Sequence, residues 1–464
     1  MPALPIGQMG MMIRSAQIFR RCLSLVLLTL LPVLPPAALA APAWQQPGAV
    51  LDEGTLLLEY LLGEKNSVLW AITTDSAQLF ELPGRAEIEQ AAQRVYELLT
   101  ARIPGENETN LVAFRRAAQA ETQYPAAARA LSQMILGPVA DQLGKKRLLI
   151  VADGALHSIP FAALPDPVAS SQLSVVSSKA AINQQPATDN RQPLIVNHEI
   201  VSLPSASVLG MLRRRKQSLP PAPRWLALLA DPVFEKDDPR FRPSAAKGGA
   251  NASGLRSANG ASIAGTRGPL ARLRFARDEA DQIWATLSTA QLEQSLAADD
   301  FAANQDLALS SAMSEYRYLH FATHGVLDQS RPELSGLALS MFDQAGREQD
   351  GFLRLVEIYN LKLAAELVTL SACETGLGKQ MRGEGIIGLT RGFLHAGAQR
   401  ALVSLWKVDD RASARLMGQV YAGIFRDKLS PAAALRRAQL AMREDPAMKS
   451  PFFWAAFVLH GEPR

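Results

Sequence analysis

The sequence is poor in cysteine, with two among 464 residues, Cys22 and Cys373. Small folds that depend on disulfides carry more cysteines, usually in even numbers. Because Cys22 lies in a segment that we expect to be removed, Cys373 is the single thiol of the mature chain and no intramolecular disulfide can form. Such a thiol is either buried and inert or reactive, and its neighbours must distinguish the two cases.

A strong excess of one charge is also missing. The net charge is +4, and basic residues form isolated clusters such as residues 211–216. Nucleic-acid binding needs a concentrated basic surface, so we expect no nucleic-acid partner. The composition, 48% hydrophobic and 20% charged, is typical of a globular protein. A chain of this length exceeds one ordinary core, which predicts two domains or two fused halves.

The first forty residues contain no apolar run long enough for a typical membrane span. A basic region precedes a short apolar stretch (residues 23–34), and "ALA" at 38–40 supplies small residues before a cleavage position. Prolines interrupt the apolar stretch before it reaches the ~20 residues that a span needs. We therefore expect residues 1–40 to be a cleaved signal peptide, with an uncleaved anchor as the alternative. The mature protein would be exported, periplasmic or extracellular, without stable membrane insertion.

Hydrophobic periodicity predicts an α/β chain. In the N-terminal half (50–220), the pattern indicates short strands in 55–82, helices over 85–102 and 125–144, a buried strand at 147–153 and a strand leading into a helix at 199–216. Clustered prolines at 219–225 mark a boundary. The polar stretch 166–193 reads as a surface loop, and 235–268 reads as a flexible insertion in the C-terminal half (222–464).

In the C-terminal half, apolar strands alternate with amphipathic helices. Strands are predicted at 225–234, 316–323, 366–373, 400–408 and 452–461, and helices at 385–397, 410–429 and 430–445. Gly397 should end the first of these helices, and Ser430 should cap the last. Such alternation predicts a mostly parallel sheet covered by helices on both faces.

Three reactive groups follow the carboxyl ends of predicted strands, where open α/β sheets form their sites. His324 and Gly325 follow one strand, Cys373 ends the next, and Asp409 and Asp410 follow a third. A thiol reacts as its thiolate and needs a base nearby.

Among the six histidines, His324 is the one followed by glycine at a strand end, whereas His320 lies within the strand and should pack among its neighbours. Their H-x-x-x-H spacing suits one face of a helix rather than a strand, and no third ligand accompanies them. We therefore expect no metal and no cofactor.

The stretches "HFATHG" and "LSACETG" resemble the CHAT family, a branch of the caspase-like cysteine peptidases. His324 precedes Cys373 by 49 residues, and caspases place their histidine about 50 residues before the cysteine. The resemblance extends to "RGEGIIGLTRGFLHAGAQRALVSLW", "PFFWAAFVLHG", "RLLIVADGALHSIPFAALP" and "LPSASVL", and so covers the chain from about residue 52. Family members often carry tetratricopeptide repeats, but no 34-residue periodicity is present here.

The resemblance implies a caspase-like α/β fold whose peptidase half follows a related-looking, non-catalytic half that offers a surface for protein partners. Cys373 would be the nucleophile and His324 the acid–base partner of an endopeptidase acting on proteins or peptides. The backbone N–H groups of Gly325 and Cys373 would stabilise the oxyanion. No third catalytic member is needed.

Three alternatives stay open: a catalytically silent scaffold that binds partners, a cell-envelope amidase, and a structural envelope component whose cysteine is incidental. Substrate binding is assigned to Asp409 and Asp410. Because Asp410 is placed to cap a helix starting at Arg411, Asp409 is the better candidate for the pocket that takes the side chain before the cut. A carboxylate there would favour arginine or lysine.

Overall fold

The computed structural model describes residues 51–105, 108–167, 191–218, 220–241, 270–326, 328, 331–372, 384–407 and 409–464. All of them belong to one compact unit, Gln46–Arg464. The predicted signal peptide, Cys22, Cys373 and most of the predicted loops at 166–193 and 235–268 lie outside the described residues.

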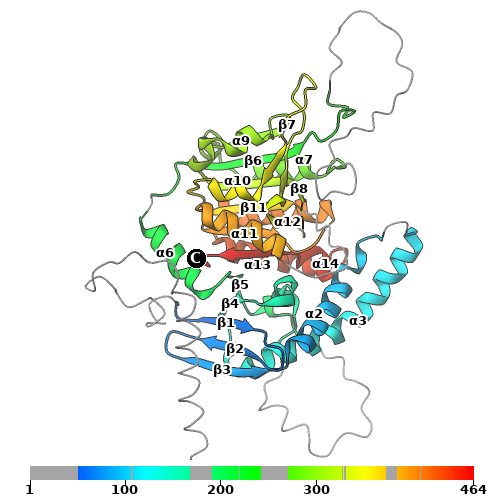
Figure 1. Ribbon diagram of the computed structural model, residues 1–464, viewed down its shortest axis with the longest axis vertical. Helices are drawn as coiled ribbons and strands as arrows, with labels where there is room; N and C mark the ends of the chain where they lie inside the picture. The colour runs from blue at the N-terminus through cyan, green and yellow to red at the C-terminus, as the bar shows by residue number, and fades with distance from the viewer. Residues whose placement is uncertain are drawn as a thin grey trace, which may run out of the picture. The chain divides into compact units, whose positions relative to one another are not determined.

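Both halves of the chain contribute strands to one sheet (Figure 1). Its 13 strands are β1 (Thr55–Leu61), β2 (Ser67–Ile72), β3 (Ala77–Leu82), β4 (Arg147–Val151), β5 (Ile200–Ser202), β6 (Arg224–Pro232), β7 (Leu296–Asp300), β8 (Tyr316–Val326), β9 (Gly336–Ala338), β10 (Phe352–Arg354), β11 (Leu367–Ala372), β12 (Arg400–Ser404) and β13 (Phe457–Gly461). The order along the sheet is β10-β9-β8-β11-β12-β13-β5-β4-β1-β2-β3, and β6 pairs with β8 and β7. The predicted fold class, a mostly parallel sheet with helices, is confirmed.

The helices pack on the sheet through apolar faces. They are α2 (Arg85–Leu99), α3 (Asn110–Leu136), α4 (Ala140–Leu143), α6 (Ala206–Ser218), α7 (Ala276–Trp284), α8 (Thr289–Leu292), α9 (Gln305–Leu309), α10 (Leu355–Asn360), α11 (Glu384–Ala396), α12 (Asp410–Phe425), α13 (Pro431–Glu444) and α14 (Pro451–Trp454). Gly397 follows α11 with φ +127°, and the Ser430 hydroxyl accepts a hydrogen bond from the Ala433 N–H, so both predicted helix ends are confirmed.

The helix predicted over 125–144 has the wrong boundaries, since α3 spans Asn110–Leu136. The segment predicted to start a helix at Pro125 lies inside α3, which begins at Asn110. Proline is common in the first turn of a helix, which is why the sequence indicated a start there. Pro125 is exposed, so water can hydrogen-bond the carbonyl that the missing N–H leaves without a helical partner.

The central strands are apolar on both faces because helices cover both faces. In β6, Leu228 and Ala230 join the cluster that contains α7, α12 and α13, whereas Ala227 and Leu229 join the cluster that contains α10 and α11. Alternate residues of a strand point to opposite faces, so a strand between two helical layers is apolar at every position. This arrangement confirms the predicted double covering and leaves polar groups for the ends of the strands.

Strand β13 joins the two halves. It pairs antiparallel with β12 and parallel with β5, with His460 opposite Ser202. Just after it, Glu462 accepts hydrogen bonds from Arg213 of α6, which also binds Asp52. The predicted halves 50–220 and 222–464 are thus linked by backbone pairing and by the partly buried ion pair of Arg213 with Glu462.

Candidate functional site

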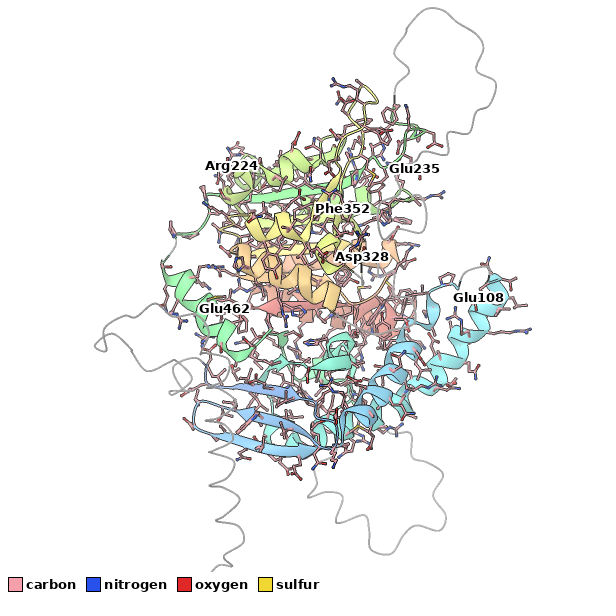
Figure 2. The ribbon with its side chains drawn as sticks, in the orientation of Figure 1. Glu108, Arg224, Glu235, Asp328, Phe352 and Glu462 are labelled. Carbon is pink, nitrogen blue, oxygen red and sulfur yellow. The ribbon has the colours of Figure 1, made fainter. Side chains whose placement is uncertain are left out.

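The parallel strands β6, β8 and β11 end at one edge of the sheet. Figure 2 shows Arg224 at the start of β6 and Glu235 beyond its end, with Asp328, which follows β8, toward the Glu235 side. Ala230 pairs with Ala322, and Thr323 pairs with Ala372. This edge therefore carries Asp231 and His324, as the strand polarity predicted for His324. Cys373, bonded to Ala372, lies outside the described residues.

Strand β8 is longer than predicted. It continues through His324 and Gly325 to Val326, and its last three residues pair antiparallel with β9. The hairpin of β9 and β10 supplies this extra partner, which the sequence around residue 324 does not reveal. His324 is therefore held in an extended strand and not in a turn.

His324 is nearly enclosed, with 4% of its surface exposed. Its Nε2 lies 2.6 Å from the carbonyl oxygen of Ala271, and its ring packs against Phe234 with centroids 5.2 Å apart. A carbonyl only accepts hydrogen bonds, so Nε2 carries a proton. In the neutral ring, Nδ1 then holds the lone pair that a general base uses. Sequence reasoning missed Ala271 because any residue can supply a backbone carbonyl.

Beneath this edge, His320 belongs to a buried polar network. Its Nε2 lies 2.9 Å from Oε1 of Glu279 in α7, and its Nδ1 lies 3.2 Å from the Tyr421 hydroxyl in α12. The hydroxyl of Ser371 in β11 donates to Oε2 of Glu279 at 3.0 Å, and Tyr421 also bonds Thr369. Burial raises the pKa of Tyr421, so its hydroxyl stays protonated. The prediction that His320 packs within the core is confirmed, whereas Glu279 was not predicted.

The structure places the helix cap on Asp409 instead of the predicted Asp410. Asp409 caps α12, since its Oδ1 accepts a hydrogen bond from the Ala412 N–H at 3.0 Å, and the helix begins at Asp410. The prediction that Asp410 caps a helix starting at Arg411 is wrong by one residue. Either aspartate can cap in such a sequence, and only the backbone conformation decides which one does.

Asp410 is the more buried of the two aspartates. Burial raises the pKa of its carboxyl, the charge of Asp409 adds to the rise, and Lys407 and His324 act against it. Asp409 is exposed and Asp410 half-buried. The reason for preferring Asp409 as the pocket residue is therefore removed.

The two histidines of β8 have separate partners. Nε2 of His320 faces Glu279, and Nε2 of His324 faces Ala271. Within the described parts of the chain, no three His, Cys, Asp or Glu side chains are grouped so that they could hold one metal ion. Over the same residues, no helix combines the length and hydropathy needed to cross a bilayer.

Comparison with known proteins places this arrangement in a family. The CHAT domain model matches residues 125–462. The chain is 35% identical over 113 residues to tetratricopeptide repeat protein 28 of Homo sapiens, and 34% identical over 109 residues to the Mus musculus protein. Each match covers 24% of this chain and only 4% of the relative.

A solved structure shares the fold. The structure of separase from Saccharomyces cerevisiae, determined in complex with securin, aligns with a TM-score of 0.52 and 11% identity. The alignment covers 91% of this chain and 30% of the separase chain. At this identity the likeness concerns the fold alone. The protein therefore belongs to the CHAT domain family and has the caspase-like α/β fold.

Proposed function

We propose that this protein is a cysteine endopeptidase in which Cys373 and His324 cleave peptide bonds of protein substrates. One observation carries the proposal: Ala372 of β11 pairs in parallel with Thr323 of β8. The residues that follow Ala372 and Thr323 in the sequence are Cys373 and His324. Neighbouring strands lie about 4.8 Å apart, so this register supports contact between the thiol and the imidazole.

The contact of His324 with Ala271 suggests how the proton moves. With Nε2–H bonded to the carbonyl, Nδ1 takes the thiol proton as sulfur attacks the substrate carbonyl carbon. The proton then passes to the leaving amine as the C–N bond breaks, which leaves a thioester. Water attacks the thioester carbon as Nδ1 accepts its proton. The C–S bond then breaks, the acid product is released, and the proton on Nδ1 returns to the sulfur of Cys373. The N–H groups of Gly325 and Cys373 are the proposed donors to the oxyanion.

We propose Asp410 as the residue that recognises the side chain before the cut. It is half-buried, whereas the Asp409 carboxylate is exposed and engaged as a helix cap. A carboxylate that is charged when substrate binds would prefer arginine or lysine there. A substrate cation would also offset the burial that raises the pKa of Asp410.

Export remains part of the proposal and rests on the sequence of residues 1–40. A basic region, an apolar stretch and small residues at 38–40 support a cleaved signal peptide. Mass spectrometry of the protein purified from its own cell envelope or medium tests this. A mature N-terminus at Ala41 is expected, and an intact Met1 in the isolated protein would contradict it.

The test of the main proposal compares the full chain with Cys373→Ala and His324→Ala. Each protein is incubated with a proteome-derived peptide library, and new termini are identified by mass spectrometry. The unaltered chain should produce new peptide termini, and neither variant should do so. Loss of either member of a catalytic pair abolishes the activity of both. Each variant should keep a Tm within about 2 °C of the unaltered chain.

Purified peptidoglycan, incubated in parallel, separates a peptidase from an amidase. Release of amide-cleavage products from peptidoglycan, with no cleavage in the peptide library, would replace the peptidase proposal by an envelope amidase. No cleavage of either material, together with unchanged thiol reactivity in His324→Ala, would favour a silent scaffold.

A further inference from the structure

The carbonyl that binds His324 lies in a segment without regular secondary structure. Residues 270–273 precede α7 and make no ladder hydrogen bonds with a strand. A segment of this kind keeps its place only through its side chains. On one side of Ala271, Leu270 is buried in a small apolar cluster with Phe234 and Val326. On the other side stands Arg272.

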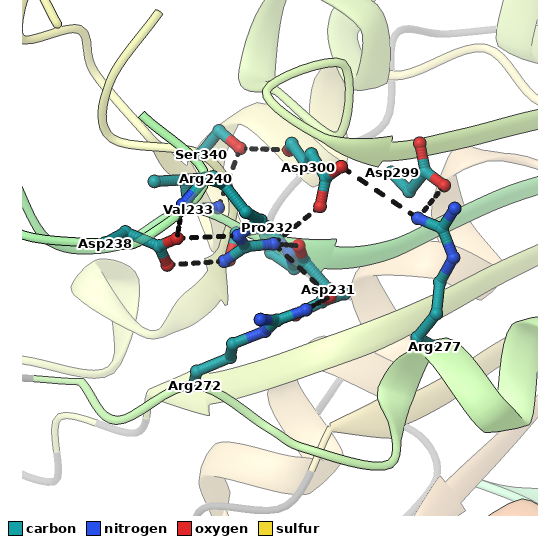
Figure 3. Close-up of polar contacts among 10 residues, drawn as sticks. All are labelled: Asp231, Pro232, Val233, Asp238, Arg240, Arg272, Arg277, Asp299, Asp300 and Ser340. Atoms are coloured by element: carbon teal, nitrogen blue, oxygen red, sulfur yellow. Dashed lines mark hydrogen bonds and ion pairs between the residues drawn. The ribbon is translucent and has the colours of Figure 1, made fainter. Parts of the chain in front are cut away.

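Arg272 is tied to the end of β6 by a two-point ion pair. Its Nε donates to Oδ1 of Asp231 at 2.9 Å, and its Nη2 donates to Oδ2 (Figure 3). The Asp231 side chain is 1% exposed, whereas that of Arg272 is 42% exposed. Paired guanidinium–carboxylate bonds fix orientation as well as distance, which a single contact does not.

Asp231 is itself held from a second direction. Arg240 donates through Nη1 to the Asp231 carbonyl oxygen at 2.6 Å and to Oδ1 of Asp300 at 2.7 Å. Its Nη2 donates to Oδ2 of Asp238 at 2.7 Å. Figure 3 shows the guanidinium of Arg240 surrounded by these acceptors, with Arg272 reaching Asp231 from below. The Asp231 carboxylate is therefore a fixed point to which the 270–273 segment is attached.

We propose that Asp231 and Arg272 are positioning residues, which hold the Ala271 carbonyl against Nε2 of His324 and so keep the proton on that nitrogen. The inference rests on the proposed role of His324 as the acid–base group. Ala271 and Arg272 are adjacent, so movement of the Arg272 backbone moves the carbonyl. Without the Asp231–Arg272 ion pair, the neutral His324 ring is free to adopt the tautomer that carries its hydrogen on Nδ1. In that tautomer Nδ1 has no lone pair to accept the thiol proton.

The chain offers a matched control. Arg277 lies in the first turn of α7, its side chain is 45% exposed, and it forms an ion pair with Asp299. Arg277 is about as exposed as Arg272 and lies in the same region of Figure 3, but its partner Asp299 is 37% exposed where Asp231 is 1% exposed, and Arg277 is not adjacent to Ala271. The test set is Arg272→Met, Arg272→Lys and Arg277→Met, each in the full chain.

The kinetic readout separates positioning from substrate binding. For Arg272→Met we expect kcat to fall about 10- to 100-fold with KM within twofold, since misplacing a catalytic group by about 1 Å costs up to ~10²-fold. Arg272→Lys should recover part of kcat, because a lysine reaches Asp231 as a point charge without the second bond. Arg277→Met should match the unaltered chain. Equal kcat in Arg272→Met and Arg277→Met would overturn the proposal.

A second readout does not depend on catalysis. In protein labelled with ¹⁵N-histidine, the His324 signals are identified by their loss in His324→Ala. The unaltered chain and Arg277→Met should show the Nε2–H tautomer, and Arg272→Met should show a mixture. If the chain cleaves nothing but the tautomer shifts, positioning stands and the peptidase proposal falls. A tautomer that does not change in folded Arg272→Met refutes positioning. If Arg272→Met does not fold, Asp231→Asn, which keeps the shape and removes the charge, takes its place with the same expectations.

Discussion

The buried network around Glu279 predicts by how much the substitution Glu279→Ala lowers Tm. Glu279→Ala removes the carboxylate that faces Nε2 of His320 and accepts the Ser371 hydroxyl. Glu279 is 3% exposed and His320 fully buried, so water does not replace the lost partner. A buried polar group without a partner costs about 1–3 kcal/mol, and two such groups give about 4 kcal/mol.

That energy converts to a shift in Tm. Globular proteins unfold with an entropy of about 2.1 cal/mol/K per residue near 60 °C. Over the roughly 400 residues of the compact unit Gln46–Arg464, this gives ~0.8 kcal/mol/K, so 4 kcal/mol lowers Tm by about 5 °C. Differential scanning calorimetry of the unaltered chain and the variant measures it, provided that the transition is reversible.

Two further variants make the calorimetric result decisive. Glu279→Gln keeps an acceptor for Ser371 and a polar neighbour for His320, and it should lose less than about half of the shift. Ser371→Ala leaves His320 its carboxylate but leaves Oε2 of Glu279 without its donor, so it should cost about 2 kcal/mol, or roughly 2 °C. If Ser371→Ala lowered Tm as much as Glu279→Ala, or if Glu279→Ala cost under 1 °C, the account of this network would be wrong.

Three further results are expected. Iodoacetamide should alkylate Cys373 rapidly near pH 7 in the native chain, because Nδ1 of His324 takes the thiol proton as the sulfur attacks. Reaction only after denaturation would contradict a catalytic thiol. Among peptides that differ only in the residue before the cut, those with arginine or lysine should be cleaved best. Asp410→Asn should lower kcat/KM for these peptides at least ~10-fold, whereas Asp409→Asn should mainly lower Tm. A preference for an acidic residue before the cut would refute the assignment. Burial and the charge of His157 lower the pKa of His460 to about 3 in the folded chain. The unfolded chain therefore binds a proton on this histidine first, at about pH 6.5. The contribution of His460 to stability is complete above pH ~6.5 and is lost as the pH falls from about 6.5 toward 3. His460→Gln should flatten the fall of Tm below pH 6.5, and an unchanged slope would argue against this.

The sequence predicted the sheet and its polarity because these follow from repeating patterns. Apolar runs such as Leu367–Ala372, separated by amphipathic helices, constrain a chain to parallel strands between two helical layers. The helix ends at Gly397 and Ser430 were equally predictable, since each depends on the chemistry of one residue. The wrong helix start at Pro125 has the same origin, because proline usually lies in the first turn of a helix. Its solvent exposure explains why α3 continues through it.

The site was predictable only in part. His324 could be selected from its strand and the glycine that follows, but its partner is a backbone carbonyl, which has no sequence signature. Glu279 was missed because it lies in α7, 37 residues before β8 begins, and only packing brings it under the strand. The cap was assigned to Asp410 instead of Asp409 because the helix starts one residue earlier than predicted. Long-range packing and single-residue register are the two kinds of information that local patterns lack.

The pairing of β13 with both β12 and β5 has a consequence for any attempt to obtain the C-terminal half alone. A fragment starting near Arg224 would carry β13 as an outer strand, with the N–H and C=O groups that face β5 left bare. Uncovered strands of this kind recruit other chains and promote aggregation or domain exchange. It would also lose Asp52 and Arg213 around Glu462. The N-terminal half thus acts as a permanent cover, and the two halves should melt in one transition.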